Sequence, residues 1–195
     1  MRFEEFEFGA TWIVYSEIHS DSRGDFKETL RRDKFLNLTG LDFQVEQTSS
    51  STSSLGVLRG IHYSVSKVGQ AKWVTCLRGE IKDYVVDLRP TSPTFGKWNA
   101  INLSAANGKS LIIQSVIGHA FEALENESIV SYSLTSSYDP DTEMTISPFD
   151  TQLSIHGTST FQRYPTVIKM RHRSQSKYLK GICLVVTSDY ESASQ

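Results

Sequence analysis

The stretch "AKWVTCLRGEIKDYVVDLR" (71–89) decides the fold, because two strand-like runs meet in it at an Arg-Gly-Glu turn. Both runs are rich in Val, Ile and Tyr, which favour extended chain. The period of two in a strand puts Lys72 and Val74 on one side of the first run, and Asp83 and Val85 on one side of the second. The stretch therefore predicts two short, half-buried strands joined by a tight turn.

Similar runs recur on both sides of this stretch, separated by turns that contain Gly, Pro, Asn or Ser. Further strands are expected at 11–18, 41–47, 55–65, 98–104, 109–114, 119–125 and 128–138. One short helix is expected at 31–40, where Gly40 ends it, and the Ser/Thr tract at 48–54 is expected to be a polar loop. Many short strands without long helical periodicity predict an all-β sandwich or jelly roll.

The bulk properties narrow the functional classes. A length of 195 residues favours a single domain with a substantial core. The net charge of −2 argues against a general nucleic-acid binder and against an electrostatically driven membrane binder. The start of the chain lacks the pattern of a signal peptide, and no apolar run approaches the ~20 residues that a membrane span needs. Cys76 and Cys183 are too few and too far apart for a disulfide framework or a zinc site, so a cytoplasmic protein is expected.

The stretch "GVLRGIHYS" (56–64) places a cation and an imidazole inside a predicted strand. Unpaired polar groups inside a protein are costly, so both side chains need partners. Arg59 and His62 are three residues apart and would point to opposite faces of a regular strand. Gly60 lies between them and predicts a bulge that turns both side chains inward.

Four residues together suggest a reaction, namely His62, Lys72, His119 and Tyr132. Each alone is more often a core histidine, an edge lysine or a packed tyrosine. Together, a histidine can remove a proton, an ammonium can stabilise an oxyanion, and a phenol can return a proton. The segment between His62 and Lys72 is expected to be a hairpin connection, which would put the two on neighbouring strands. This set suits proton abstraction beside a carbonyl through an enolate, as in an isomerase or epimerase without a redox cofactor.

Metal binding is the rival interpretation of the histidines. β-Barrels that hold a metal often use a His-x-His pair and a carboxylate, but Tyr63 and Ser64 follow His62. Lys72 lies where a carboxylate would be expected, and its positive charge repels a metal. We therefore expect no metal.

Five blocks of the chain resemble, in order, those of the dTDP-4-dehydrorhamnose 3,5-epimerase family. They are "RGDFKE" (23–28), "GVLRGIHY" (56–63), "AKWVTCLRGEIKDYVVDLRPTSPTFGKW" (71–98), "GHAFEAL" (118–124) and "YSLTSSYDPDTE" (132–143). The resemblance implies a cupin-type jelly roll that needs no cofactor, and a homodimer that exchanges N-terminal strands. "GIHYSV", "VTCLRG" and "GHAFEALE" are most similar to the branch for special deoxysugars, some members of which epimerise only C3.

The resemblance also implies roles for individual residues. His62 would remove the proton beside the C4 keto group, Lys72 would stabilise the enolate oxygen, and Tyr132 would act as the acid on the opposite face. Arg23, Arg59 and His119 would bind the diphosphate and the sugar. The nucleotide would contact Glu28, Gln47 and Glu143, with Phe26 and Tyr138 stacking on the thymine. Lys169 and Arg171 would reach phosphate, and Ser49 occupies a position where the family commonly has Asn.

Two further departures from the family pattern stand out. Gln114 and Ser115 replace a usual Pro-Pro pair, and His172 stands where the family has an Asp that orients the catalytic histidine. An imidazole cannot supply the fixed negative charge of that Asp. Either Asp83 or another acid replaces it, or the alignment slips there, or the activity is weakened or changed.

The sequence thus predicts one domain (1–195), with a jelly-roll core at about 11–157 and a C-terminal extension at 158–195. The leading hypothesis is an epimerase of a dTDP-4-keto-6-deoxyhexose that inverts C3, with or without C5. A 3,4-ketoisomerase of the same substrates, a non-catalytic sugar-nucleotide binding protein and a metal-dependent cupin stay open as alternatives.

Overall fold

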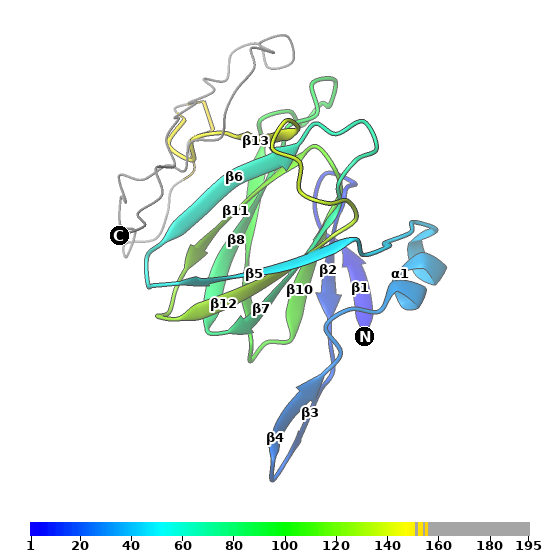
Figure 1. The fold of residues 1–195 in the computed structure, drawn as a ribbon, viewed down its shortest axis with the longest axis vertical. Helices are drawn as coiled ribbons and strands as arrows, with labels where there is room; N and C mark the ends of the chain where they lie inside the picture. The colour runs from blue at the N-terminus through cyan, green and yellow to red at the C-terminus, as the bar shows by residue number, and fades with distance from the viewer. Residues whose placement is uncertain (151, 154, 156–195) are drawn as a thin grey trace, which may run out of the picture.

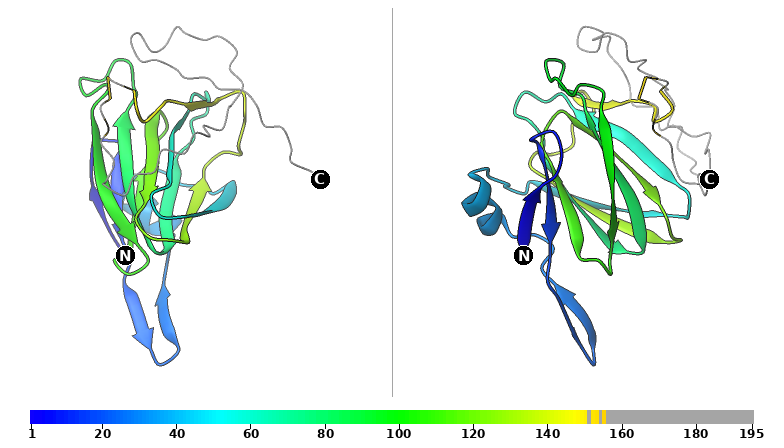
Figure 2. Two further views of the ribbon diagram at one scale, coloured as in Figure 1. Left: turned by 90° about the vertical axis from the view of Figure 1, so that its left-hand side faces the viewer. Right: turned by 180° about the vertical axis from the view of Figure 1, so that it is seen from behind.

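Two antiparallel sheets face each other in a jelly-roll sandwich (Figures 1 and 2). The structure, a computed structural model, describes residues 1–150, 152, 153 and 155. The six-stranded sheet has the order β1 (Arg2–Glu5), β2 (Thr11–Tyr15), β10 (Lys109–Ile113), β7 (Lys72–Arg78), β12 (Ser128–Leu134) and β5 (Gln47–Ser53). The five-stranded sheet has the order β13 (Glu143–Thr145), β6 (Leu58–Ser64), β11 (Ile117–Ala123), β8 (Glu80–Asp87) and β9 (Trp98–Ser104). The predicted all-β fold is confirmed.

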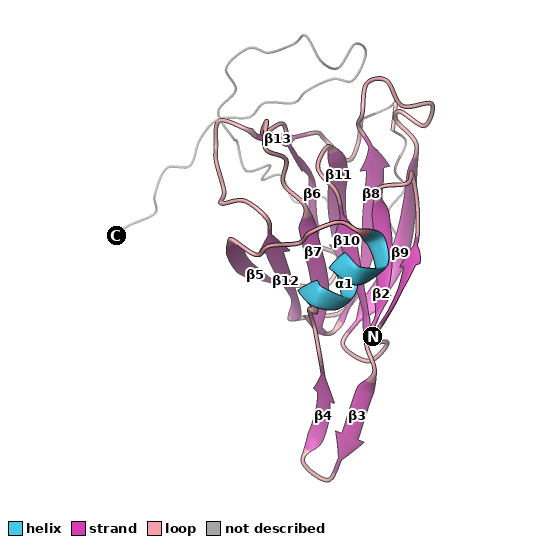
Figure 3. Ribbon diagram, turned by 90° about the vertical axis from the view of Figure 1, so that its right-hand side faces the viewer, coloured by secondary structure: helices cyan, strands magenta, loops and turns pink. Residues whose placement is uncertain are grey.

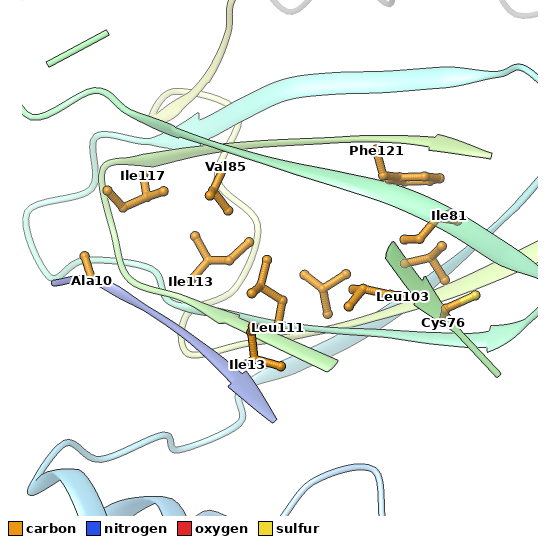
Figure 4. Close-up of a cluster of buried hydrophobic side chains, with 12 residues drawn as sticks. Ala10, Ile13, Cys76, Ile81, Val85, Leu103, Leu111, Ile113, Ile117 and Phe121 are labelled. Atoms are coloured by element: carbon orange, nitrogen blue, oxygen red, sulfur yellow. The ribbon is translucent and has the colours of Figure 1, made fainter. Parts of the chain in front are cut away.

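The space between the sheets is filled mainly by aliphatic side chains (Figure 4). Ile13, Val74 and Leu111 from the six-stranded sheet meet Val85 and Phe121 from the five-stranded sheet. All five are nearly or fully buried, and burial of one such side chain contributes roughly 1.5–3 kcal/mol. This apolar core fixes the position of the two sheets relative to each other. It thereby also fixes the relative positions of the polar side chains that they carry.

A hairpin and a helix lie outside the sandwich. Strands β3 (Ile18–Asp21) and β4 (Gly24–Lys27) pair only with each other and project from one end of the molecule (Figures 1 and 3). Helix α1 (Arg32–Thr39) follows and ends at Gly40, whose N–H donates to the Leu36 carbonyl at 2.8 Å with φ at 71°. The predicted helix is therefore confirmed. No helix among the described residues is long and apolar enough to cross a membrane.

Helix α1 covers part of the outer face of the six-stranded sheet (Figure 3). Phe35, fully buried, packs edge-on against Trp73 with ring centroids 6.1 Å apart. Phe43 packs against the same indole at 5.4 Å. Phe43 is buried although it lies in a loop. The strand predicted at 41–47 is wrong, because residues 41–46 form no strand and β5 begins only at Gln47.

The Ser/Thr tract predicted to be a loop is instead strand β5, so that prediction was wrong. β5 pairs with β12 without interruption from Gln47, opposite Leu134, to Ser53, opposite Ser128. Backbone pairing with a strand whose position the core already fixes outweighs the weak strand preference of serine. The hydroxyls of alternate residues then point toward the interior and become available to the site.

The bulge predicted at Gly60 is confirmed. β6 pairs with β11 at His62 opposite His119 and again at Arg59 opposite Phe121, and the register shifts between these two pairs. Gly60 has a φ of 115°, and a Cβ there would lie 2.5 Å from the carbonyl oxygen of His119. Only glycine fits such a conformation and such a close approach of two backbones.

Candidate active site

The predicted catalytic residues come from both sheets. His62 lies on β6 in the five-stranded sheet, whereas Lys72 lies on β7 and Tyr132 on β12 in the six-stranded sheet. The prediction that His62 and Lys72 occupy paired hairpin strands is wrong, because the connection at 65–71 crosses from one sheet to the other. The long Lys72 side chain nevertheless reaches back, with Nζ 3.5 Å from the His62 carbonyl oxygen. The sandwich therefore brings the two residues together across its interior.

His62 is held by a hydroxyl group. Its Nδ1 lies 3.1 Å from Oγ1 of Thr145, which stands directly opposite His62 in the β13–β6 pair. Burial lowers the pKa of His62 to about 3, and the positive charges of Lys72, His119 and Arg59 add to the effect. The imidazole is consequently neutral near pH 7 and has a lone pair with which to accept a proton.

Asp83 lies behind His119 rather than behind His62. Its Oδ2 is 2.8 Å from Nε2 of His119, and both side chains are almost fully buried. Burial raises the pKa of Asp83, and the contact with His119 opposes that rise. Oδ1 of Asp83 has no hydrogen-bond partner among the residues that the structure describes. The suggestion that Asp83 replaces the orienting acid of His62 is therefore wrong.

Lys72 and Glu143 are two buried residues whose opposite charges act on each other. Each side chain belongs to a residue that is 8% exposed. Burial lowers the pKa of Lys72, and the charge of Glu143 works against this. Burial likewise raises the pKa of Glu143, and the charge of Lys72 works against that. The pair thus keeps a cation in a place where an isolated ammonium would be costly.

Tyr132 enters the site from the sheet opposite His62. Its hydroxyl lies 2.8 Å from Oγ of Ser51, and its ring packs edge-on against His119 with centroids 6.3 Å apart. Burial raises the pKa of Tyr132 to about 12, so the phenol stays protonated at neutral pH. A protonated phenol and a neutral imidazole therefore belong to opposite walls of one site.

Arg59 spans the two sheets near one end of the site. Its Nε donates to Oγ of Ser53 at 2.9 Å, and its Nη2 donates to the carbonyl of Thr52 at 3.1 Å. Both partners belong to β5, the Ser/Thr strand. Ser51, Ser53 and Thr145 could not be predicted as site residues, because single hydroxyl residues in strands form no motif.

Part of the predicted nucleotide-binding set also comes together. The backbone N–H of Tyr138 donates to Oε1 of Gln47 at 2.7 Å. Nε2 of Gln47 donates in turn to Oγ of Ser49 at 3.0 Å. These three residues are adjacent at the Gln47 end of β5, where Tyr138 is 47% exposed and accessible to a ligand.

The other predicted binding residues do not join this site within one chain. Arg23 lies in the turn between β3 and β4 and pairs with Asp21, and Phe26 on the same hairpin is 66% exposed. Glu28 pairs with Arg31 beside the helix. Lys169, Arg171 and His172 lie outside the described residues.

Comparison with known proteins decides the family. The profile of the dTDP-4-dehydrorhamnose 3,5-epimerase family matches residues 5–177. The chain belongs to this family. The dTDP-4-dehydrorhamnose 3,5-epimerase of Mycolicibacterium smegmatis is 39% identical over 150 residues, which is 77% of this chain and 75% of that protein. The dTDP-4-dehydrorhamnose 3-epimerase of Streptomyces niveus is 37% identical over 155 residues, 80% of this chain and 75% of that one.

Solved epimerase structures share the fold. A 4-keto-6-deoxy sugar epimerase from the novobiocin gene cluster of Streptomyces spheroides superposes with a TM-score of 0.80 at 36% identity, over 85% of this chain and 83% of that one. A 3'-monoepimerase of Streptomyces bikiniensis in complex with dTDP-quinovose gives 0.77 at 35% identity, over 80% and 79% of the two chains. The predictions of a cupin-type fold, of this epimerase family and of an isomerase are confirmed.

Proposed function

We propose that this family member inverts C3 of a dTDP-4-keto-6-deoxyhexose, with His62 as base, Lys72 as enolate-stabilising cation and Tyr132 as acid. The observation that carries this proposal is the placement of His62 and Tyr132 on opposite sheets, with the ammonium of Lys72 beside His62. A sugar ring between the sheets would present one face to each group. Removal of a proton on one face and its return on the other inverts the carbon.

Each step has a residue of suitable protonation state. Neutral His62 takes the C3 proton, and the electron pair of the C–H bond moves through C3–C4 onto the C4 oxygen. Lys72 stabilises the enolate oxygen that forms. This electrostatic stabilisation is larger in a buried site than in water. Tyr132 then donates its proton to C3, the C4 carbonyl re-forms, and Ser51 stabilises the phenolate that remains. Transfer of the proton from His62 to solvent and from solvent to Tyr132 completes the cycle.

Substrate binding would also strengthen the base. Arg59 and His119, which we assign to the diphosphate and the sugar, are among the groups whose positive charge lowers the pKa of His62. The negative charge of a bound diphosphate offsets them and therefore raises the pKa of His62. Recognition of the nucleotide end would thus prepare the proton abstraction at the sugar end.

The nucleotide would lie at the Gln47 end of β5, where Gln47, Ser49 and Tyr138 are adjacent. The projecting hairpin carries Arg23 and the exposed Phe26 away from its own site. We therefore propose a homodimer in which each hairpin supplies Arg23 and Phe26 to the partner's nucleotide site. The single domain, the absence of a cofactor and the cytoplasmic location stay predictions from the sequence.

C3 is the reacting carbon that the relatives named above have in common. The Mycolicibacterium protein is named a 3,5-epimerase and the Streptomyces niveus protein a 3-epimerase. The identities of 39% and 37% favour neither type for this chain. We therefore assign C3, and the experiment below also reads C5.

Incubation with dTDP-4-keto-6-deoxyglucose in D2O, followed by NMR, tests the proposal. The wild-type chain is expected to incorporate deuterium at C3 and to invert it, and label at C5 as well would identify a 3,5-epimerase. His62→Asn is expected to abolish the exchange. Tyr132→Phe is expected to retain exchange at C3 while inversion falls by about 10²-fold or more, because His62 can return the proton only to the face from which it came.

Lys67→Met is the matched control for Lys72→Met, because Lys67 is an exposed lysine of the connection at 65–71. It should leave exchange unchanged, whereas Lys72→Met should slow it by about 10²-fold or more. Persistence of C3 exchange in His62→Asn would contradict the assigned base. A product with the carbonyl at C3 would identify a ketoisomerase, and tight dTDP binding without exchange a non-catalytic binding protein.

A further inference from the structure

The second nitrogen of the His62 ring is engaged by a neutral group. Thr145 stands opposite His62 in the β13–β6 register, and its Oγ1 lies 3.1 Å from Nδ1. The two nearby carboxylates are engaged otherwise, because Asp83 pairs with His119 and Glu143 faces Lys72. Within the described part of the chain, the hydrogen-bonding partner of Nδ1 is therefore a hydroxyl group.

We propose that Thr145 is the positioning residue of the catalytic base, and that it holds His62 in the tautomer with its proton on Nδ1. This inference rests on the proposed function of His62 and deepens it. A neutral imidazole carries one proton and one lone pair, and the nitrogen with the lone pair is the base. When Nδ1–H donates to Oγ1 of Thr145, the lone pair lies on Nε2, which is the nitrogen left for the substrate.

A hydroxyl orients the ring but adds no charge. The charged groups that act on His62 are Lys72 from β7, His119 from β11 and Arg59 from β6 itself. Tyr132 from β12 packs against His119, Asp83 from β8 hydrogen-bonds to His119, and the charge of Glu143 from β13 acts on Lys72. No described carboxylate therefore neutralises the imidazolium directly. An acidic partner would both orient the His62 ring and compensate the positive charge of its imidazolium. Here Thr145 orients the ring, and the bound diphosphate would supply the compensating negative charge.

Substitution of Thr145 separates this role from simple packing. Thr145→Val keeps the shape of the side chain and removes the hydroxyl, whereas Thr145→Ser keeps the hydroxyl. Thr145→Val is expected to lower kcat for C3 exchange by about 10- to 100-fold with a KM within about threefold of wild type, and Thr145→Ser to stay within about threefold. Thr142→Val is the matched control, because the Thr142 hydroxyl contacts only the Asp139 carbonyl in the described structure.

Nitrogen-15 NMR of the histidine rings, recorded on the ligand-free chain, gives a readout that is independent of activity. The wild-type chain and Thr145→Ser should show His62 protonated at Nδ1, and Thr145→Val should show a mixture of tautomers. Wild-type exchange and an unchanged tautomer in Thr145→Val would overturn the inference, as would a wild-type ring protonated at Nε2. Failure of the proposed function is distinguishable, because it would appear as exchange that survives His62→Asn. If Thr145→Val does not fold, the wild-type tautomer and the Thr145→Ser activity still decide.

Discussion

At the scale of the residue, burial keeps the base His62 deprotonated and the acid Tyr132 protonated at neutral pH. Burial penalises whichever form is charged, so it lowers the pKa of His62 to about 3 and raises that of Tyr132 to about 12. The base is thereby deprotonated and the acid protonated across the whole neutral range. Neither group needs a charged neighbour to reach the state that its task requires.

The pH dependence of the reaction follows from these directions. His62 acts as base only when neutral, so activity is present above its pKa and lost as the pH falls through it. In the ligand-free chain this loss lies near the pKa of about 3, and bound diphosphate moves it upward. We expect kcat/KM to be flat between about pH 5 and 7, with the acid limb of kcat at higher pH than that of kcat/KM.

Arg59→Gln provides the complementary measurement. It removes one of the positive charges that lower the pKa of His62, so the acid limb of kcat/KM should move to higher pH. Circular dichroism at each pH controls for unfolding. A wild-type kcat/KM that falls already between about pH 7 and 6 would show that His62 is not held neutral by its surroundings.

At the scale of the element, β6 depends on Gly60 for both its shape and its pairing. A side chain at this position would strain a φ of 115° and collide with the backbone of His119 and Ala120. Gly60→Ala is expected to lower the free energy of unfolding by at least about 2 kcal/mol. Urea unfolding measures this, with Gly96→Ala as control, because Gly96 also has a positive φ but nothing within 4 Å of its Cβ. An equal cost at both positions would mean that strain alone, without the close approach, accounts for the effect.

Elements with an apolar face could be predicted from the sequence, and those without one could not. The runs that became β7, β8 and β10 have buried apolar residues on one face, namely Val74 and Cys76, Ile81 and Val85, and Leu111 and Ile113, and this is the pattern that predicts a half-buried strand. β5 is almost entirely Ser and Thr, and the hairpin of β3 and β4 is polar, so neither carries that signal. β5 is a strand because it pairs with β12 far along the chain, whereas β3 and β4 pair with each other across a short turn.

The sequence predicted which residues form the site but not which contacts they make with one another. His62, Lys72 and Tyr132 were identified by residue type and by resemblance, and the structure brings them together. That Lys72 faces His62 from the other sheet was not predictable, because a short connection between strands can be a hairpin or a crossover. The contacts of Thr145 and Ser51 depend on register, and a single sequence does not reveal register.

At the scale of the whole molecule, the proposed dimer divides each active site between two chains. Arg23 and Phe26 would then act in the partner's site, while His62 acts in its own. A chain with His62→Asn and a chain with both Arg23→Ala and Phe26→Ala should each have low activity alone. Each hybrid dimer, however, contains one site in which an intact His62 meets an intact hairpin.

Mixing the two inactive chains under conditions that exchange subunits tests this arrangement. Random pairing makes half of the dimers hybrids with one complete site of two, so activity should recover to about a quarter of that of wild type. A mixture of His62→Asn with Lys72→Met is the control and should recover no activity. His62 and Lys72 act in the site of their own chain, so each site of the hybrid dimer still lacks one of them. Absence of recovery in the first mixture, with subunit exchange verified by mass, would contradict the shared site.

The bulge at Gly60 also makes β6 sensitive to its own length. Arg59 and His62 reach the same interior only because one extra residue lies between the positions that pair with Phe121 and His119. Insertion of a further residue between them would add one step to the alternation and turn Arg59, the phosphate-binding cation, to the face opposite the base, whereas deletion of one residue would remove the bulge and leave both side chains on one face. The connection at 65–71 has no such alternation to keep and should absorb the same insertion. A one-residue insertion should thus cost this family member more activity in β6 than in the connection at 65–71.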